Sequence, residues 1–328
     1  MKAIIPVAGV GTRLRPHTHT TPKVLIKVAG KTIIEYIIDE IIQYRIIDEI
    51  IFIVGYLGDQ IKEFIERKYQ KKIALSFITQ EQRKGLGHAI FLARTISQGH
   101  PVLIILGDTI FKTNFKKIIN SEKNFIGVKE VEDPSRFGVV FLNQEKKIEK
   151  FIEKPSSSKS KLAIVGIYLI QDSKLLFEKI DKIIKQGIKT KGEYQLTDAL
   201  ELLLKEKIEM EIFEIEKWLD CGKPETLLAT NRVLLEQHGN NRKIKNGIII
   251  PPVYISKNAQ VEESIIGPYV SIGDNVIVKH SLISDSIIND SAMIEKLMLS
   301  GSLIGREAVL KGICRHLNIG DSSEVRFG

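Results

Sequence analysis

The chain has 328 residues, and because domains usually hold about 100–200 residues, this length predicts about two of them. Its 48 basic and 40 acidic residues give a net charge of +8, while 43% of the residues are hydrophobic and 27% are charged. This balance is ordinary for a globular chain and excludes long disordered regions, which need low hydrophobicity.

The elements predicted for the first hundred residues alternate between strands and helices. Residues 31–45, for example, carry paired isoleucines at helical spacing, such as Ile33, Ile34, Ile37 and Ile38. Such alternation predicts an α/β fold with a Rossmann-like, mostly parallel sheet and helices on both faces. The strands are expected at 2–8, 49–54, 73–79 and 102–106, and the helices at 31–45, 58–70 and 86–98.

The same domain is expected to continue to about residue 240. The helix predicted at 224–237 ends before Gly239, Asn240 and Asn241, which indicate a linker. The predicted domains are therefore 1–240 and 241–328. Before the linker we expect strands at 125–131, 137–142, 147–153, 162–170 and 210–215, and helices at 173–186 and 196–206.

After residue 245, small and aliphatic residues recur in four rows with steps of 17 and then 16 positions. Neither an α-helix nor a simple alternating strand produces such rows. A triangular parallel β-helix does, because each flat side is one short strand and inward side chains stack between coils. We therefore expect a short left-handed parallel β-helix of the hexapeptide-repeat kind over residues 246–328. The rows are Ile255, Ile272, Ile288, Ile304; Val261, Val278, Ile294, Leu310; Ile266, Ile283, Leu299; and Ala259, Val276, Ala292, Ala308.

The composition also indicates the cell compartment and the classes of binding partner to expect. Two cysteines, Cys221 and Cys314, are too few for a disulfide framework and indicate a reducing compartment. No N-terminal apolar run is long enough for a signal peptide or a membrane span, so we expect a cytoplasmic protein without a membrane partner. The lysines are scattered rather than gathered in one block, so no nucleic-acid partner is expected, although the net charge suits polyanionic ligands.

A glycine-rich turn follows the first predicted strand. Gly9 and Gly11 form a Gly-x-Gly pair, and glycines let a backbone approach a phosphate closely. The third glycine of the dinucleotide fingerprint is missing, so the turn alone is a weak signal. Arg13 and Lys23 strengthen it, because cations near a triphosphate stabilise charge that builds on the transferring phosphorus.

Seven motifs in order closely resemble the sugar-1-phosphate nucleotidylyltransferases, or NDP-sugar pyrophosphorylases. This family includes glucose-1-phosphate thymidylyltransferase and UTP–glucose-1-phosphate uridylyltransferase. The match covers most of residues 1–235. Its motifs lie at residues 7–31, 80–89, 106–108, 136–140 with 153–155, 165–168, 192–198 and 218–222.

The resemblance implies a nucleotide site and a metal site. Arg13 and Lys23 would be catalytic, with Arg13 on the β- and γ-phosphates and Lys23 near the α-phosphate. Asp108 and Asp220 would converge on Mg²⁺, since a hard divalent cation prefers carboxylate and phosphate oxygens. The amide of Gln80 suits the imide edge of uracil or thymine. The nucleotide-binding residues implied are Ala8, Gly9, Gly11, Thr12, Gln80 and Gly85.

The resemblance also implies a site for the sugar 1-phosphate. Lys154 would hold its phosphate as a further catalytic residue, and Glu153 and Gly138 would bind sugar hydroxyls. Lys191 stands where many members carry Arg, and it lacks the bidentate guanidinium fork. The full set is Gly138, Glu153, Lys154, Val165 and Lys191.

The reaction implied is attack of a sugar 1-phosphate oxygen on the α-phosphorus of an NTP, with pyrophosphate leaving. The nucleophile is already an anion, so positioning and charge neutralisation suffice. We expect dTTP or UTP and glucose 1-phosphate as substrates and a homo-oligomer formed through the β-helix. The alternatives are a mannose-1-phosphate guanylyltransferase and a non-catalytic regulatory homologue. An acyltransferase role of the β-helix, through His280 or His316, is the less favoured reading of that domain.

Overall fold

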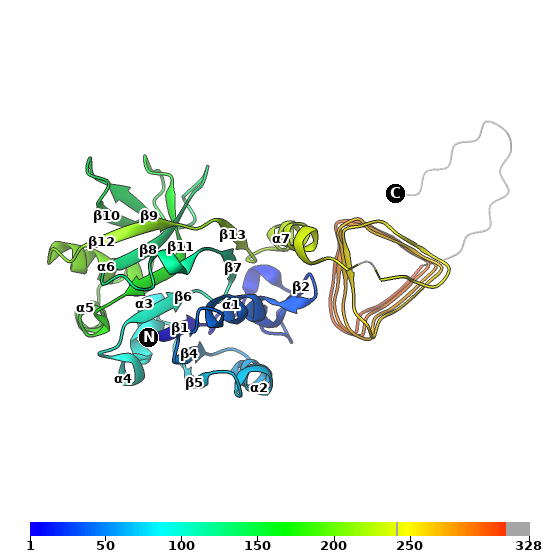
Figure 1. Ribbon diagram of the computed structural model, residues 1–328, viewed down its shortest axis with the longest axis horizontal. Coiled ribbons are helices and arrows are strands. Elements are labelled where there is room, and N and C mark those ends of the chain that lie inside the picture. The colour runs from blue at the N-terminus through cyan, green and yellow to red at the C-terminus, as the bar shows by residue number, and fades with distance from the viewer. Residues whose placement is uncertain (241, 313–328) are drawn as a thin grey trace. The chain divides into compact units, whose positions relative to one another are not determined.

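The computed structural model describes residues 1–240 and 242–312, which form two compact units (Figure 1). The first unit comprises Met1–Lys27 and Lys31–Thr230, and the second comprises Val28–Gly30 and the chain from Asn231 onward. Cys314 and His316 lie outside the described residues. No helix in the described part is long and apolar enough to cross a membrane.

One large sheet organises the first unit. Four of its strands run parallel in the order β6-β1-β4-β5, which confirms the Rossmann-like α/β class. Strands β1, β4 and β6 consist mostly of buried hydrophobic residues, whereas β5 lies at the edge of the sheet and is only partly buried. Their bounds are β1 Lys2–Pro6, β4 Glu49–Val54, β5 Ala74–Thr79 and β6 Val102–Ile105.

The other half of the sheet is largely antiparallel. Strand β11 (Leu162–Ile170) runs against both β6 and β8, and β9 and β10 form an antiparallel pair beyond it. No α-helix lies between residues 106 and 172, so these strands connect without the helical crossovers that parallel pairing usually requires. The sheet is therefore more mixed than the strand–helix alternation predicts. The bounds are β8 Asn124–Glu130, β9 Gly138–Leu142, β10 Ile148–Glu153 and β12 Met210–Glu214.

The helices follow the predicted positions, with two differences. Helix α1 begins at Ile33, because Thr32 and Glu35 form a reciprocal capping box and residues 31–32 belong to a short strand. The helix predicted at 86–98 is divided at Ala93. The bounds are α1 Ile33–Ile42, α2 Gly58–Tyr69, α3 Leu86–Leu92, α4 Arg94–Ser97, α5 Ser173–Lys185, α6 Leu196–Lys205 and α7 Pro224–His238; the 3₁₀ turns are η1 Thr12–Leu14, η2 Lys23–Leu25 and η3 Phe115–Lys117.

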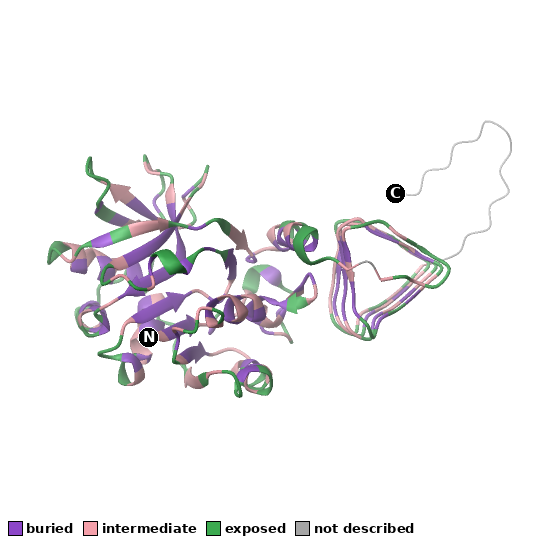
Figure 2. Cartoon of the chain, in the orientation of Figure 1, coloured by how far each residue is buried: buried purple, intermediate pink, exposed green. Residues whose placement is uncertain are grey.

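A continuous core joins one face of the sheet to helices α3, α5 and α6. Ile4 and Ile51 of the sheet belong to the same buried cluster as Ile90, Phe177 and Leu200 of these helices. Figure 2 shows this buried interior as purple segments along the strands and the facing sides of the helices. Burial of this kind supplies most of the driving force for folding, so the core fixes the strand ends that carry the candidate site.

A two-stranded antiparallel ribbon beside the large sheet was not predicted from the sequence. It pairs β7 (Thr109–Lys112) with β13 (Lys217–Asp220), and Asp220 lies opposite Thr109. The backbone N–H of Cys221 donates to the carbonyl of Asp108 at 3.4 Å. The ribbon therefore joins segments more than a hundred residues apart. A second short ribbon pairs β2 Lys27–Val28 with β3 Lys31–Thr32.

The second unit contains a parallel β-helix with a triangular cross-section, as predicted for its described part (Figure 1). Each side of the triangle is a sheet of four short parallel strands. The predicted rows are vertical neighbours: Ile255, Ile272, Ile288 and Ile304 pair in register along one sheet. The sheets are β14 Ile248–Ile249, β17 Ile265–Ile266, β20 Leu282–Ile283, β23 Met298–Leu299; β15 Val253–Ile255, β18 Val270–Ile272, β21 Ile287–Ile288, β24 Leu303–Ile304; and β16 Gln260–Glu262, β19 Ile277–Lys279, β22 Met293–Glu295, β25 Val309–Lys311.

Candidate active site

The predicted nucleotide and metal residues follow the carboxyl ends of adjacent parallel strands. Ala8 and Gly9 follow β1, Gln80 follows β5, and Asp108 follows β6. Gly55, which follows β4 between them, has no room for a side chain because a Cβ there would lie 2.9 Å from the Cβ of Ala8. In open α/β sheets this edge is where ligands bind.

The glycine-rich turn has different requirements at its two glycines. Gly11 has a φ of +70°, and a Cβ there would lie 3.0 Å from Thr18 and 3.1 Å from Lys23, so a larger residue is both strained and crowded. The Thr18 hydroxyl also donates to the Gly11 carbonyl at 2.9 Å. Gly9 is exposed, and its missing side chain leaves open space. Thr12 is exposed at the start of η1.

Asp108 lies among cations. Its Oδ2 accepts a hydrogen bond from the Lys23 ammonium at 2.9 Å, and the Lys23 side chain is only 11% exposed, against 44% for Asp108. Partial removal from water pushes the pKa of the Asp108 carboxyl up, but Lys23 and Arg13 outweigh this effect and hold that pKa below its usual value. Asp108 is therefore a carboxylate at neutral pH, as a metal ligand must be.

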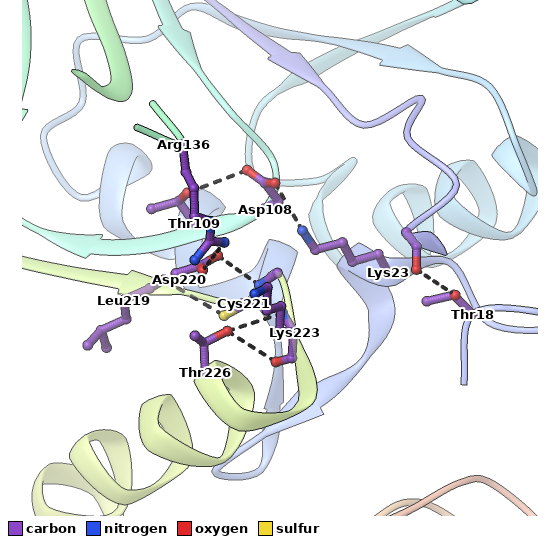
Figure 3. A network of polar contacts seen from close by, with 12 residues as sticks. Thr18, Lys23, Asp108, Thr109, Arg136, Leu219, Asp220, Cys221, Lys223 and Thr226 are labelled. Carbon is purple, nitrogen blue, oxygen red and sulfur yellow. Dashed lines mark hydrogen bonds and ion pairs between the residues drawn. The ribbon is translucent and has the colours of Figure 1, made fainter. Parts of the chain in front are cut away.

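The second predicted metal ligand is brought next to the first by the β7–β13 ribbon (Figure 3). Asp220 Oδ1 accepts from the backbone N–H of Gly222 at 2.8 Å, and its Oδ2 lies 3.6 Å from a guanidinium nitrogen of Arg136. Within residues 1–240 and 242–312, no group of three or more His, Cys, Asp or Glu side chains is placed to hold a metal. Two carboxylates alone leave coordination positions for oxygens of a bound phosphate or water.

A cavity of about 620 Å³ opens beside the two aspartates. Seven predicted site residues line it: Arg13, Asp108, Gly138, Glu153, Lys154, Val165 and Asp220. The other predicted residues are not in its lining: Ala8, Gly9, Gly11, Thr12, Lys23, Gln80, Gly85 and Lys191. The structure therefore gathers the metal residues and most of the sugar-phosphate set around one space.

Glu153 forms another part of the cavity wall. Its Oε2 accepts from the Thr197 hydroxyl at 3.0 Å, and its Oε1 lies 3.2 Å from the Lys154 ammonium. A Cβ on Gly138 would lie 3.2 Å from the same carboxylate. Glu153 is thus oriented by Thr197 on one side and by Lys154 on the other, with its carboxylate on the cavity wall.

Two groups of predicted residues lie elsewhere. Gln80 and Gly85 flank the start of α3, where the Gln80 amide nitrogen donates to the Gly85 carbonyl at 3.3 Å. Lys191 is exposed in the turn between Thr190 and Glu193, whereas Glu193 itself lines the cavity. Lys191 is thus the one member of the predicted sugar set that is not in the cavity lining.

The cavity also contains residues absent from the predicted site. Arg136 reaches Asp220, its guanidinium lies 5.7 Å from the ring centre of Phe137, and Phe137 meets the Trp218 ring edge-on at 4.8 Å. The indole Nε1 of Trp218 is buried and has no partner in the described part of the chain. Arg136, Phe137 and Trp218 belong to the motifs that carry the family resemblance, so this signal was available. Tyr168 and Thr197 also line the cavity.

Gly85 provides a direct test of the local geometry. It has a φ of +109°, and a Cβ would lie 2.6 Å from the carbonyl oxygen of Tyr194. We expect Gly85→Ala to lower the free energy of unfolding by about 3 kcal/mol, the upper end for local backbone strain. Gly99→Ala is the matched control, because Gly99 also has a positive φ of +84° but open space around it. Its expected cost is about 1 kcal/mol. Urea unfolding of both variants measures the difference, and equal costs would contradict the close contact.

Taken as a whole, this arrangement suits phosphorylated ligands. Two carboxylates face one cavity, and Arg13, Arg136 and Lys154 share its wall. A sequence model of the nucleotidyl transferase family matches residues 2–237. The chain belongs to this family, which confirms the resemblance found in its motifs.

Similar proteins agree with this family membership. The chain is 34% identical over 350 residues to a bifunctional sugar-1-phosphate nucleotidylyltransferase/acetyltransferase of Sulfurisphaera tokodaii, covering 100% of this chain and 81% of the relative. It is 29% identical over 360 residues to a glucose-1-phosphate thymidylyltransferase of Streptomyces antibioticus, covering 100% and 99%. A solved UDP-glucose pyrophosphorylase complexed with UDP-glucose superposes with a TM-score of 0.59 at 26% identity, covering 72% of this chain and 98% of that one.

Proposed function

We propose that the chain transfers a nucleotidyl group from an NTP to a sugar 1-phosphate, giving an NDP-sugar and pyrophosphate. The observation that carries this proposal is the convergence of Asp108, Asp220 and Arg13 on one cavity that also holds Glu153 and Lys154. Two carboxylates and several cations around one space suit two phosphorylated substrates. Low cysteine content favours the cytoplasm as the place of this reaction.

Each residue has a role in this proposal. Lys154, on the cavity wall, binds the phosphate of the sugar 1-phosphate and aims its oxygen at the α-phosphorus. Lys23, beside Asp108, neutralises charge near the α-phosphate, and Arg13 binds the departing pyrophosphate. Glu153, held by Thr197, accepts hydrogen bonds from sugar hydroxyls. No general base is required, because the attacking phosphate oxygen already carries charge.

Asp108 and Asp220 fit a divalent cation such as Mg²⁺. Their donor set is all oxygen, both carboxylates sit at one end of the β7–β13 ribbon, and cationic neighbours keep Asp108 ionised. When bound, the metal would act as a Lewis acid on phosphate oxygens. Lys23 pairs with Asp108 and Arg136 lies near Asp220, so a bound cation would share these two carboxylates with the two basic side chains.

The test is a substrate panel with purified full-length protein and Mg²⁺. Each of dTTP, UTP, GTP, CTP and ATP is combined with glucose, galactose, mannose and N-acetylglucosamine 1-phosphates, and pyrophosphate release is measured. We expect release only when both substrates are present, with dTTP or UTP and glucose 1-phosphate preferred. A preference for GTP and mannose 1-phosphate would identify the activity as that of a guanylyltransferase instead. No turnover across the panel would refute the proposed nucleotidyl transfer.

We further propose that the β-helix assembles the chain into a homo-oligomer. On the sheet β14-β17-β20-β23, one residue of each strand points inward and its neighbour points outward. The outward residues form an apolar column of Ile248, Ile265, Leu282 and Met298, in which Ile265 is half-buried and the other three are exposed, Met298 by 78%. An apolar stripe of four rungs on a flat face is a surface suited to a second copy.

Removal of the β-helix tests this division of labour. Truncation after Asn240 is expected to reduce the oligomer to smaller species while some pyrophosphorylase activity remains, because every phosphate-handling motif lies before residue 223. Light scattering measures the mass, and pyrophosphate release measures the activity. The double variant Leu282→Ser/Met298→Ser, in the intact chain, is the gentler companion. An unchanged mass in both would refute assembly through this column. Complete loss of turnover in a folded truncated chain would show that the β-helix is needed for catalysis.

A further inference from the structure

The Gln80 side chain is held by two contacts made by the same nitrogen. Gln80 is 6% exposed and follows β5. Its amide nitrogen Nε2 lies 3.3 Å from the carbonyl oxygen of Gly85 and 3.1 Å from Nδ1 of His88, one turn into α3. Its oxygen Oε1 makes no hydrogen bond to the described part of the chain.

The chemistry of the Gly85 carbonyl decides which way the amide points. A carbonyl oxygen can only accept, so the amide NH₂ faces Gly85, and an amide oxygen in its place would be repelled. With one N–H directed to Gly85, the other is directed to His88, whose Nδ1 must then carry a lone pair. The His88 proton is therefore on Nε2. Burial, and to a lesser extent Lys84, lower the pKa of His88, which favours the neutral ring that this pattern requires.

The backbone that orients the amide is itself fixed. The Gly85 carbonyl also accepts from the Ala89 N–H and so closes the first turn of α3. The Gly87 N–H donates to the Tyr194 carbonyl, and the Tyr194 N–H donates to the Lys84 carbonyl. Rotation of the Gln80 amide would break its contact with Gly85 and could not be relieved by a shift of this segment.

We propose that His88 and the Gly85 carbonyl hold Gln80 so that it offers the nucleobase an acceptor and no donor. This inference rests on the proposed function and on the family resemblance, which implies that the Gln80 amide meets the imide edge of the base. An isolated acceptor selects a base with a ring N–H, such as the imide of uracil or thymine. It disfavours cytosine, whose matching ring nitrogen is itself an acceptor. His88 is thus a positioning residue for base selection and touches no reacting atom.

The tautomer of His88 can be measured without substrate. The full chain is labelled with ¹⁵N-histidine, and a long-range ¹H–¹⁵N spectrum is recorded at neutral pH. The His88 signals are identified by their loss in His88→Asn. We expect the neutral Nε2–H form, with Nδ1 unprotonated. A neutral Nδ1–H form would mean that the amide points the other way, and an imidazolium would remove the acceptor; either result overturns the proposal.

Two variants of similar shape separate positioning from packing. His88→Asn can place its Oδ1 near the position of Nδ1 and so retain an acceptor, whereas His88→Leu cannot. In His88→Leu we expect the ratio of kcat/KM for UTP over CTP to fall about three- to tenfold, the range for one neutral hydrogen bond. The change should lie in KM, because the base is remote from the reacting phosphorus. His88→Asn should restore the wild-type ratio.

The outcomes distinguish this inference from the proposed function. If the wild-type chain forms no NDP-sugar in the panel, the proposed function fails whatever the spectrum shows. If the wild type is active but His88→Leu keeps the full preference for UTP over CTP, the positioning role of His88 is refuted alone. Equal losses in His88→Leu and His88→Asn, at equal thermal stability, would refute it as well, since the retained acceptor would then be irrelevant.

Discussion

Asp108→Asn and Asp220→Asn should each lower kcat by about two to three orders of magnitude, equivalent to several kcal/mol of transition-state stabilisation. Both carboxylates face the cavity at one end of the β7–β13 ribbon, and each is only partly buried. Asparagine keeps the shape of the side chain but removes the charge that a hard cation requires. Turnover at saturating substrates and a series of Mg²⁺ concentrations measures the effect.

The fold should survive both substitutions, because neither side chain belongs to the apolar core. Circular dichroism and a thermal melt establish this point before the kinetics are interpreted. Asp181→Asn is the matched control, since Asp181 pairs with Lys185 on α5 and does not line the cavity. A kcat within about twofold of wild type in Asp108→Asn or Asp220→Asn would rule out the metal role of that residue.

The second large effect is expected at Arg13. Its side chain lines the cavity, lowers the pKa of the Asp108 carboxyl, and comes close to Gly222, where a Cβ would lie 3.3 Å from its Nη2. A cation beside the two proposed metal ligands suits the charge that would collect on pyrophosphate as it leaves. Arg13→Gln should therefore lower kcat/KM for the NTP about a hundredfold, which is the usual cost of removing one preorganised hydrogen-bond donor from a transition state.

Arg13→Lys separates charge from geometry. Lysine keeps the charge but not the planar fork, so we expect a loss intermediate between wild type and Arg13→Gln. Arg15→Gln is the control, because Arg15 is an exposed arginine of the same turn that does not line the cavity. Steady-state kinetics in the reverse direction, with pyrophosphate as the varied substrate, adds a second readout. An unchanged KM for pyrophosphate in Arg13→Gln would contradict the proposed contact.

The β-helix was the part of the fold that the sequence predicted most directly. Its contacts repeat at a fixed short interval, so Val261, Val278 and Ile294 reveal their stacking by spacing alone. The parallel half of the large sheet was predictable for a related reason. Its strands are short apolar runs that alternate with amphipathic helices, and both periodicities are local properties of the chain.

Long-range pairings were not open to prediction in this way. Nothing local in residues 109–112 indicates that they pair with residues 217–220, and this ribbon is what brings Asp108 to Asp220. The family resemblance implied that Asp108 and Asp220 converge, but it did not show that a β-ribbon brings them together. The contact of Arg136 with Asp220 is a similar case, because an arginine in a loop shows no partner in the sequence. Hydrogen-bond direction at Gln80 likewise depends on the neighbours that the fold supplies.

The in-register stacking of the β-helix makes its length independent of its cross-section. Residues 16 or 17 positions apart occupy equivalent places on successive coils, as Ile272 and Ile288 do. A duplication or deletion of one whole coil would therefore preserve every remaining rung in all three sheets. An insertion of a single residue within a strand would instead shift inward residues outward on that side. The unit can thus grow or shrink by whole coils during evolution, which would move any docking surface along its axis while the chemistry in residues 1–230 is left untouched.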